Sequence, residues 1–204
     1  MQLLLQIHIL AGVIALASAA LAVFSGKGKK THIKSGKIYF LSMLVIFSTA
    51  IPMSIVTGNI FLFLIAIFSF YLAFAGRRFA RNRKGIAGTA DWVAVGLMFI
   101  SGIGMWLLAA IYFRQDNSQY AVLIVFGALA LSLGYADLSS YKNKTAIGRK
   151  RIARHLTNMM GGTIAVITAV LVVNVNIDPQ WIVWVLPTLL ISPLIIWWNI
   201  RVLK

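Results

Sequence analysis

The side chains best suited to metal binding or acid–base chemistry in this 204-residue sequence are three histidines and four aspartates. Glutamate and cysteine are both absent. The lack of cysteine excludes a disulfide framework, a thiolate nucleophile, an iron–sulfur cluster and zinc held by cysteine. Any cofactor must therefore be held by histidine, methionine, aspartate or the backbone.

Two of the histidines share a local pattern, His-Ile-x-x-Gly. His8 precedes Gly12, and His32 precedes Gly36. Residues four apart lie on the same face of a helix, so each glycine would leave room beside an imidazole. That room would suit a flat or bulky ligand, or it would let a neighbouring helix pack closely, as small residues do in membranes. The third histidine, His155, lacks this glycine.

The aspartates differ in how well local structure explains them. Asp91 begins an apolar run, where the dipole of a helix favours a carboxylate. Asp178 precedes Pro179, a pattern typical of a helix start. Asp137 lies near the end of an apolar run, where the dipole disfavours an anion. We therefore expect Asp137 to have a partner, which would be a metal ion, a histidine or an arginine.

These residues must be positioned by membrane-spanning helices. A soluble domain would carry charge on about a quarter of its residues, whereas here 11% are charged and 60% are hydrophobic. A helix needs about 20 apolar residues to cross a bilayer. Runs of this kind cover residues 2–25, 36–57, 59–76, 91–113, 119–140, 152–175 and 181–200. The sequence predicts an all-α, polytopic membrane protein with seven helices, forming a single domain over 1–204.

The basic residues predict how the chain crosses the membrane. Of the 19 Lys and Arg residues, all but Arg114 lie in 27–37, 77–84, 142–154 and 201–204, and these segments fall on one side when the chain crosses seven times. Because basic loops stay cytoplasmic, we expect the N-terminus outside and the C-terminus inside a bacterial inner membrane. Anionic lipid head groups are the expected partners of these loops, and no motif indicates nucleic-acid binding.

Helix depth limits which candidates could share a ligand. His32, Asp91, Asp137 and His155 all fall at the cytoplasmic ends of their helices, so they could hold Zn²⁺, Mn²⁺ or Fe²⁺. One haem b is the alternative, with His32 and His155 as the depth-matched axial pair. His8 lies in the outer half, an estimated ~20 Å from His155 by helix rise, so we do not expect these two histidines to ligate the same atom; whether His8 belongs to a separate site stays open.

With these residues named, the chain resembles a bacterial family of polytopic membrane proteins of unknown function. The resemblance covers nearly the whole chain and rests on short motifs. These are His8-x-x-x-Gly12, His32-x-x-x-Gly36-x-x-Tyr39, Phe70-Tyr71-Leu72, Gly76-Arg77-Arg78, Asp91, Asp137, the stretch from His155 through Met159 to Gly162, Thr168-Ala169 and the stretch from Trp184 to Pro187. The resemblance implies that the three histidines and the two aspartates are functional, and it transfers no activity.

The sequence leaves three functions open. The first is a metal- or haem-binding membrane protein using His32, His155 and Asp137, with Asp91 in a lesser role; whether it would be an enzyme is undecided. The second is a proton-coupled or cation transporter using Asp137 and the histidines. The third is a structural or assembly partner without a cofactor, in which the polar residues only hold helices together.

Overall fold

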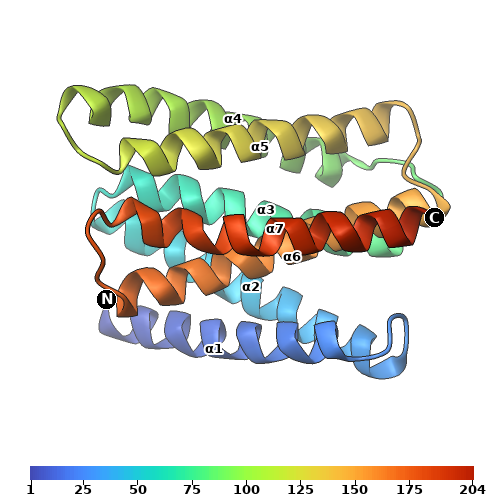
Figure 1. The fold of residues 1–204 in the computed structure, drawn as a ribbon. Coiled ribbons are helices and arrows are strands. Elements are labelled where there is room, and N and C mark those ends of the chain that lie inside the picture. Colours follow the sequence, from blue (N-terminus) through green and yellow to red (C-terminus); the bar gives the residue numbers. More distant parts are fainter. The chain divides into compact units, whose positions relative to one another are not determined.

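The computed structural model describes all residues 1–204 and is entirely helical. Seven helices are present, α1 (Gln2–Phe24), α2 (Lys30–Val56), α3 (Ile60–Arg81), α4 (Thr89–Arg114), α5 (Tyr120–Lys142), α6 (Gly148–Asn174) and α7 (Trp181–Leu203) (Figure 1). Each is long and apolar enough to cross a membrane. The predicted all-α class and the predicted number of helices are confirmed.

Three helices extend by four or more residues beyond the apolar runs at their basic ends. α2 begins at Lys30 rather than at residue 36, α3 ends at Arg81 rather than at residue 76, and α6 begins at Gly148 rather than at residue 152. Lys and Arg are good helix formers, and their long side chains reach the membrane surface from a helix that continues past the hydrocarbon. As a result, His32 lies in the first turn of α2 rather than in a loop.

The start of α7 differs from the expectation at Asp178. The helix begins at Trp181 with Gln180 as N-cap, and no side chain caps it. Instead, a turn precedes the helix, in which the Ile182 N–H donates to the Pro179 carbonyl at 3.1 Å. Asp178 is exposed in this connection, so the Asp-Pro pattern marks the turn and not the helix cap.

The chain divides into two compact units, which we describe separately. Unit 1 (Met1–Ala66) contains α1, α2 and the beginning of α3. α1 packs against α2, and its buried residues are all small: Ala11, Ala15, Ser18 and Ala19. Small residues let two helix backbones approach closely in a membrane. α1 and α2 therefore form an antiparallel hairpin closed by the short basic loop at residues 25–29.

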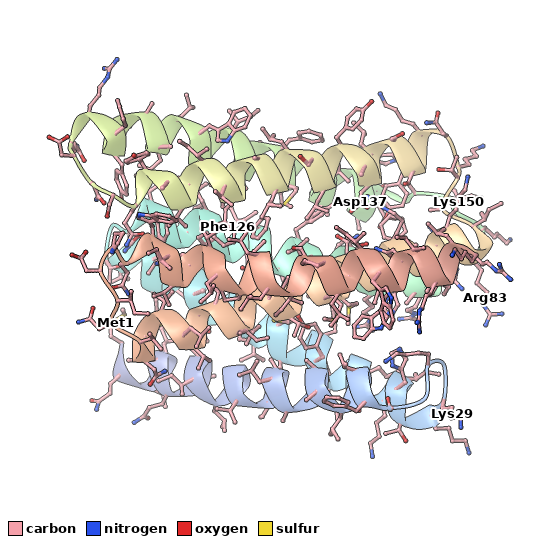
Figure 2. All side chains as sticks on the ribbon, in the orientation of Figure 1. Met1, Lys29, Arg83, Phe126, Asp137 and Lys150 are labelled. Carbon is pink, nitrogen blue, oxygen red and sulfur yellow. The ribbon has the colours of Figure 1, made fainter.

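Unit 2 (Ile67–Lys204) contains the rest of α3 and helices α4 to α7. α4 packs on α5, α6 packs on α7, and α5 also touches α7. Glycines bring these helices together: a Cβ at Gly102 would lie 2.9 Å from Leu131 Cγ, and one at Gly127 would lie 2.5 Å from Trp106 Cδ1. Figure 2 shows Arg83 and Lys150 at one end of this unit, with Asp137 further in.

Candidate functional site

Asp137 on α5 is completely buried and has an arginine as its partner. Arg154 of α6 donates to Asp137 Oδ1 from both Nε (2.8 Å) and Nη2. The Tyr71 hydroxyl of α3 donates to Oδ2 at 2.7 Å, and Asn158 Nδ2 donates to the same oxygen at 3.2 Å. Of the three partners expected for Asp137, the structure supplies arginine. The carboxylate is neutralised and hydrogen-bonded, as a buried charge requires.

Asp91 in the first turn of α4 is the second buried carboxylate, 1% exposed. Arg78 of α3 binds it through two parallel bonds of 2.6 Å, from Nε to Oδ1 and from Nη2 to Oδ2. The Gly88 N–H also donates to Oδ2 at 2.8 Å, which confirms that Asp91 caps the start of α4. A bidentate arginine is a stronger and more directional partner than a single hydrogen bond.

Aromatic side chains join the two ion pairs into one cluster, which we call the ionic cluster (Asp91, Arg78, Tyr141, Phe79, Arg154, Asp137, Tyr71 and Asn158). Tyr141 donates to Asp91 Oδ1 at 3.5 Å and stacks on Phe79, with ring centroids 4.9 Å apart. The Arg154 guanidinium lies 6.0 Å from the centroid of Phe79. The cluster therefore ties α3, α4, α5 and α6 together at the basic end of unit 2.

Helix α6 contributes a polar face that sequence analysis missed. Arg151, Arg154, His155 and Asn158 lie at positions i, i+3, i+4 and i+7 of one helix, a spacing that places them on one face. Arg151 Nη1 donates to the carbonyls of Phe79 (3.0 Å) and Ala80 at the end of α3. This spacing could have identified the face, but the sequence predicts Arg151 and Arg154 as part of the basic segment 142–154, whose charge indicates only the side of the membrane.

His155 is held by the backbone of α3. Its Nδ1 lies 2.8 Å from the Gly76 carbonyl oxygen, and because a carbonyl only accepts, Nδ1 carries the proton. A Cβ at Gly76 would lie 2.7 Å from Met159 of α6, so this glycine allows close packing of α3 and α6. His155 is therefore part of the α3–α6 contact.

His8 is half-buried in α1 and bonds to α2. Its Nδ1 lies 2.9 Å from Thr49 Oγ1. The Thr49 hydroxyl is within hydrogen-bond distance of the Val45 carbonyl (2.8 Å) and the Ile46 carbonyl (2.9 Å). Because its one proton goes to these carbonyls, Thr49 Oγ1 accepts from Nδ1–H. A neutral His8 then carries a lone pair on Nε2.

His32 has a different local role at the other end of the hairpin. Its Nδ1 lies 3.0 Å from the carbonyl oxygen of Ala22, which also accepts from Lys27 Nζ at 3.2 Å. Ala22 belongs to the last turn of α1, where carbonyls lack helical partners. His32 and Lys27 therefore satisfy the C-terminus of α1. Ala22 lies 14 residues beyond His8, so the two imidazoles are separated by about 21 Å along α1.

The glycines one turn after His8 and His32 do not serve helix packing. A Cβ placed on Gly12 or on Gly36 would meet no heavy atom within 4 Å. Of the two explanations open for these glycines, close helix contact is thus not what the structure shows. It shows open space on the same helix face as each imidazole.

The four residues predicted as metal ligands are not gathered into one group. His32 belongs to unit 1, whereas Asp91, Asp137 and His155 belong to unit 2. No three histidines and aspartates form a cluster that could hold a metal ion. In unit 2 both carboxylates already have arginine partners. These two carboxylates therefore serve charge compensation within unit 2.

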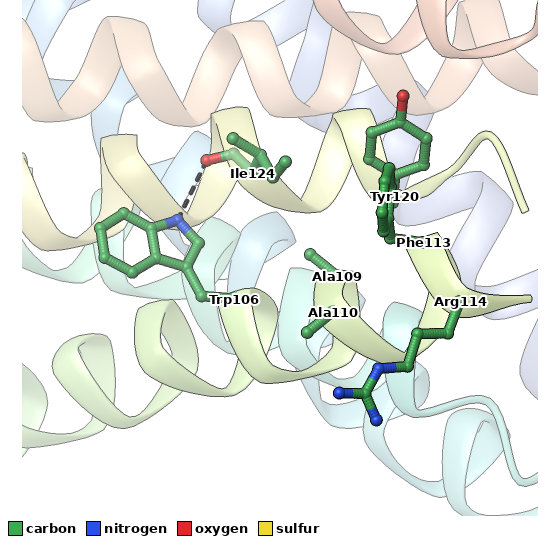
Figure 3. A pocket seen from close by; sticks show the side chains of 7 residues that line it. All are labelled: Trp106, Ala109, Ala110, Phe113, Arg114, Tyr120 and Ile124. Atoms are coloured by element: carbon green, nitrogen blue, oxygen red, sulfur yellow. Dashed lines mark hydrogen bonds between the residues drawn. The ribbon is translucent and has the colours of Figure 1, made fainter. Parts of the chain in front are cut away.

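Unit 2 also has two surface hollows. The first, of about 360 Å³, lies between α4 and α5 and is lined by Trp106, Ala109, Ala110, Phe113, Arg114, Tyr120 and Ile124 (Figure 3). Trp106 Nε1 donates to the Ile124 carbonyl at 3.2 Å, and Phe113 and Tyr120 meet edge to face at 5.2 Å. The second hollow lies at the opposite, basic end of α5.

Comparisons with protein-family models, with curated proteins and with solved structures found no match. The resemblance of the short motifs to a bacterial membrane-protein family therefore stays a prediction. The function has to be argued from the geometry of the residues themselves.

Proposed function

We propose that this chain is a haem-binding protein of a bacterial inner membrane, with the N-terminus outside and the C-terminus in the cytoplasm. The orientation is supported by the concentration of Lys and Arg in alternate connections. Haem b is the proposed cofactor, and the His8 imidazole of unit 1 would hold it. The observation that carries the proposal is the combination of an anchored imidazole at His8 with open space at Gly12.

The first support is the protonation state of His8. A histidine that ligates a metal usually donates its other ring N–H to a protein acceptor, which sets the tautomer and the ring orientation. Thr49 is such an acceptor, at 2.9 Å from Nδ1. Its own hydroxyl is directed to the α2 backbone. With Nδ1–H donated to Thr49, Nε2 would be the atom that binds the iron.

The second support is the shape of the surface beside His8. Gly12 is one turn away on the same face, and a Cβ there would meet nothing within 4 Å. Leu5 and Ile9 near His8 are 49% and 56% exposed, so apolar side chains border the same region. A planar macrocycle with apolar edges suits an open surface bordered by apolar side chains, whereas a small hydrated ion does not.

Three residues of unit 1 would have separate roles in haem binding. His8 would bind the iron, Thr49 would keep His8 in the correct tautomer, and Gly12 would admit the ring. When bound, haem b supplies a one-electron redox centre whose potential depends on axial ligation and local polarity. His32 stands as a second candidate with the same glycine spacing, but its bond to the α1 C-terminus already explains its presence.

The ionic cluster of unit 2 supports a structural role for Asp91 and Asp137 in this protein. Each carboxylate has a cationic partner and further donors. Beyond Asn158, most of the large buried side chains of unit 2 are apolar, among them Leu72, Met98 and Phe126, and the neutral hydroxyls of Ser101 and Thr168 are the buried polar groups there. This arrangement favours holding helices over moving a solute, so we do not assign transport to Asp137.

The test is an absorption spectrum of the detergent-purified protein, from cells supplied with a haem precursor, in the oxidised and the dithionite-reduced state. We expect the bands of a b-type haem and, by pyridine haemochrome assay, one haem per chain. His8→Gly should lose the haem, and added imidazole should restore it, because free imidazole can occupy the vacated space.

Gly12→Leu should also lose the haem, because its side chain would fill the space beside His8. The matched control is Gly96→Leu on α4, since Gly96 is an equally open helical glycine without a histidine beside it. Gly96→Leu should keep the haem. Protein without haem bands, or bands that survive His8→Gly unchanged, would overturn the proposal.

A further inference from the structure

The second hollow of unit 2 lies where the chain passes from α5 to α6. It has a volume of about 480 Å³ and is lined by Lys144, Thr145, Ile147, Arg149, Lys150 and Leu203. Three of these side chains are cationic and one is a hydroxyl. No carboxylate lines the hollow, although all four aspartates of the chain belong to unit 2.

The cations of this hollow differ from the nearby arginines of the ionic cluster. Arg78 and Arg154 each form an ion pair with an aspartate, and Arg151 donates hydrogen bonds to carbonyls of α3. Lys144, Arg149 and Lys150 are all exposed and form no ion pair. Their charge is therefore not needed to hold unit 2 together.

Two of these cations lie at the start of α6, where the helix dipole disfavours positive charge unless an anion is bound. Arg149 and Lys150 lie in the first turn of α6, which contains no acidic residue and has no side-chain cap. The N-terminal end of a helix carries partial positive charge, so cations there repel it while an anion would be stabilised. An anion in the hollow would be attracted by both the three side chains and the helix end.

The remaining walls of the hollow are aliphatic. Ile147 before α6 and Leu203 at the end of α7 are 52% and 50% exposed. A free anion gains nothing from such walls, whereas a phospholipid places its phosphate beside its own glycerol and acyl chains. Cationic and aliphatic groups lining one hollow at a helix end therefore match the two parts of a lipid.

We propose that this hollow binds an anionic phospholipid, with the phosphate among Lys144, Arg149 and Lys150 and the hydrocarbon against Ile147 and Leu203. The site is independent of haem binding, because it uses no residue of unit 1. It also gives a specific location to the general attraction between basic loops and anionic lipid. That attraction is on the order of RT or more for each basic residue near the membrane surface.

The experiment measures the thermal unfolding temperature in detergent while phosphatidylglycerol, phosphatidylcholine or inorganic phosphate is added. We expect phosphatidylglycerol to raise the temperature and to remain bound in native mass spectra. Phosphatidylcholine and inorganic phosphate should have much smaller effects. An equal effect of inorganic phosphate would overturn the lipid assignment and indicate a free-phosphate site instead.

The variant Arg149→Gln/Lys150→Gln should lose most of the phosphatidylglycerol effect. In lipid-free detergent it should be as stable as the natural chain, or more stable, because two charges that oppose the helix end are removed. Lys29→Gln/Lys30→Gln, at an exposed basic site in unit 1, is the matched control and should retain the lipid effect. Equal losses in both double variants would show that lipid is attracted by overall charge, and would contradict a specific site.

Discussion

The glycines beside the histidines of unit 1 and the glycines at the α4–α5 contact of unit 2 have opposite surroundings, and the polar side chains of the two units also differ. In unit 1, a Cβ on Gly12 or Gly36 would meet nothing, whereas in unit 2 a Cβ on Gly102 or Gly127 would collide with the neighbouring helix. Unit 1 has no carboxylate, and its histidines bond to a hydroxyl and a carbonyl. Unit 2 holds all four aspartates and buries two of them against arginine.

The same residue type therefore has a different structural explanation in each unit. A glycine against a facing helix is explained by packing, and a carboxylate facing arginine is explained by charge compensation. A glycine facing open space beside an anchored histidine is explained by neither. For that reason we place the cofactor in unit 1 and the structural ties in unit 2. The predictions below test this division, from the largest expected effect to the smallest.

The largest effect should come from separating Asp137 from Arg154. Arg154→Leu leaves a fully buried carboxylate without its cation, which is expected to cost about 3–5 kcal/mol of the free energy of unfolding. Unfolding in mixed micelles with increasing SDS measures the loss. The double variant Asp137→Leu/Arg154→Leu should recover most of it, because an apolar pair needs no compensation. A double variant as unstable as the single one would contradict the electrostatic explanation.

Arg78→Leu serves as an internal comparison for that prediction. The Arg78 side chain is 38% exposed and the Arg154 side chain is 19% exposed. Each carboxylate would keep other donors, the Gly88 N–H for Asp91 and Tyr71 with Asn158 for Asp137, so the exposure of the arginine is the difference that the comparison tests. We expect a smaller loss of stability for Arg78→Leu than for Arg154→Leu, and the reverse order would show that burial does not determine the strength of these ties.

The next effect concerns glycine in unit 2. Gly127→Ala would place a Cβ 2.5 Å from Trp106 Cδ1 and 3.1 Å from the Gly102 carbonyl oxygen. The Trp106 ring is held by its bond to the Ile124 carbonyl, so α4 and α5 must separate slightly. Overpacking of this kind costs about 1–3 kcal/mol. The same SDS titration checks it, and unchanged stability would mean that Trp106 turns aside without cost.

A smaller effect should follow from releasing His8. Thr49→Val keeps the shape of the side chain but removes the acceptor for Nδ1, and we expect a loss of about 1 kcal/mol of stability. If His8 ligates haem, the reduced absorption bands and the midpoint potential should also shift while the haem stays bound. Thr49→Ser retains a hydroxyl and should restore the natural spectrum. If the spectrum is the same in Thr49→Val and Thr49→Ser as in the natural chain, Thr49 is not part of the proposed site.

The smallest effect should have the opposite sign. Gly12→Ala adds a methyl group to open space, and alanine in a helix interior is about 0.5–1 kcal/mol more stable than glycine. The haem-free protein should therefore gain stability while Gly127→Ala loses it. A loss at Gly12 would show that this glycine is also needed for packing, which would erase the difference between the two units.

Prediction from sequence succeeded for properties that depend on one segment of the chain alone. Each membrane-spanning run is apolar over enough consecutive residues to be recognised alone, so the number and class of the helices were predictable. The helix ends were less predictable, because the apolar runs end near the basic residues whereas the helices continue through them. Helix α3 continues to Arg81, and helix α6 starts at Gly148. Arg154 lies inside the predicted run, and its ion pair with Asp137 depends on how two helices meet, which no single segment shows.

The chemistry of Asp137 shows the limit of that approach. Its position at the end of an apolar run was enough to predict a partner, because an unpaired carboxylate is too costly there. Which partner it has depends on Arg154 of α6 reaching α5, and Tyr71 joins it from 66 residues away. The explanation of Gly12 and Gly36 was also beyond the sequence, because open space and close packing are properties of neighbours.

By itself, then, the sequence determined that the chain is a membrane protein of seven helices and that Asp137 needs a partner, since hydrophobicity, charge and the cost of burial are local properties. Only the tertiary structure decided that arginines neutralise the buried aspartates, and that His8 is anchored beside open space while Gly127 is filled by Trp106. Those facts depend on which helix faces meet, and residues far apart in the chain settle that together.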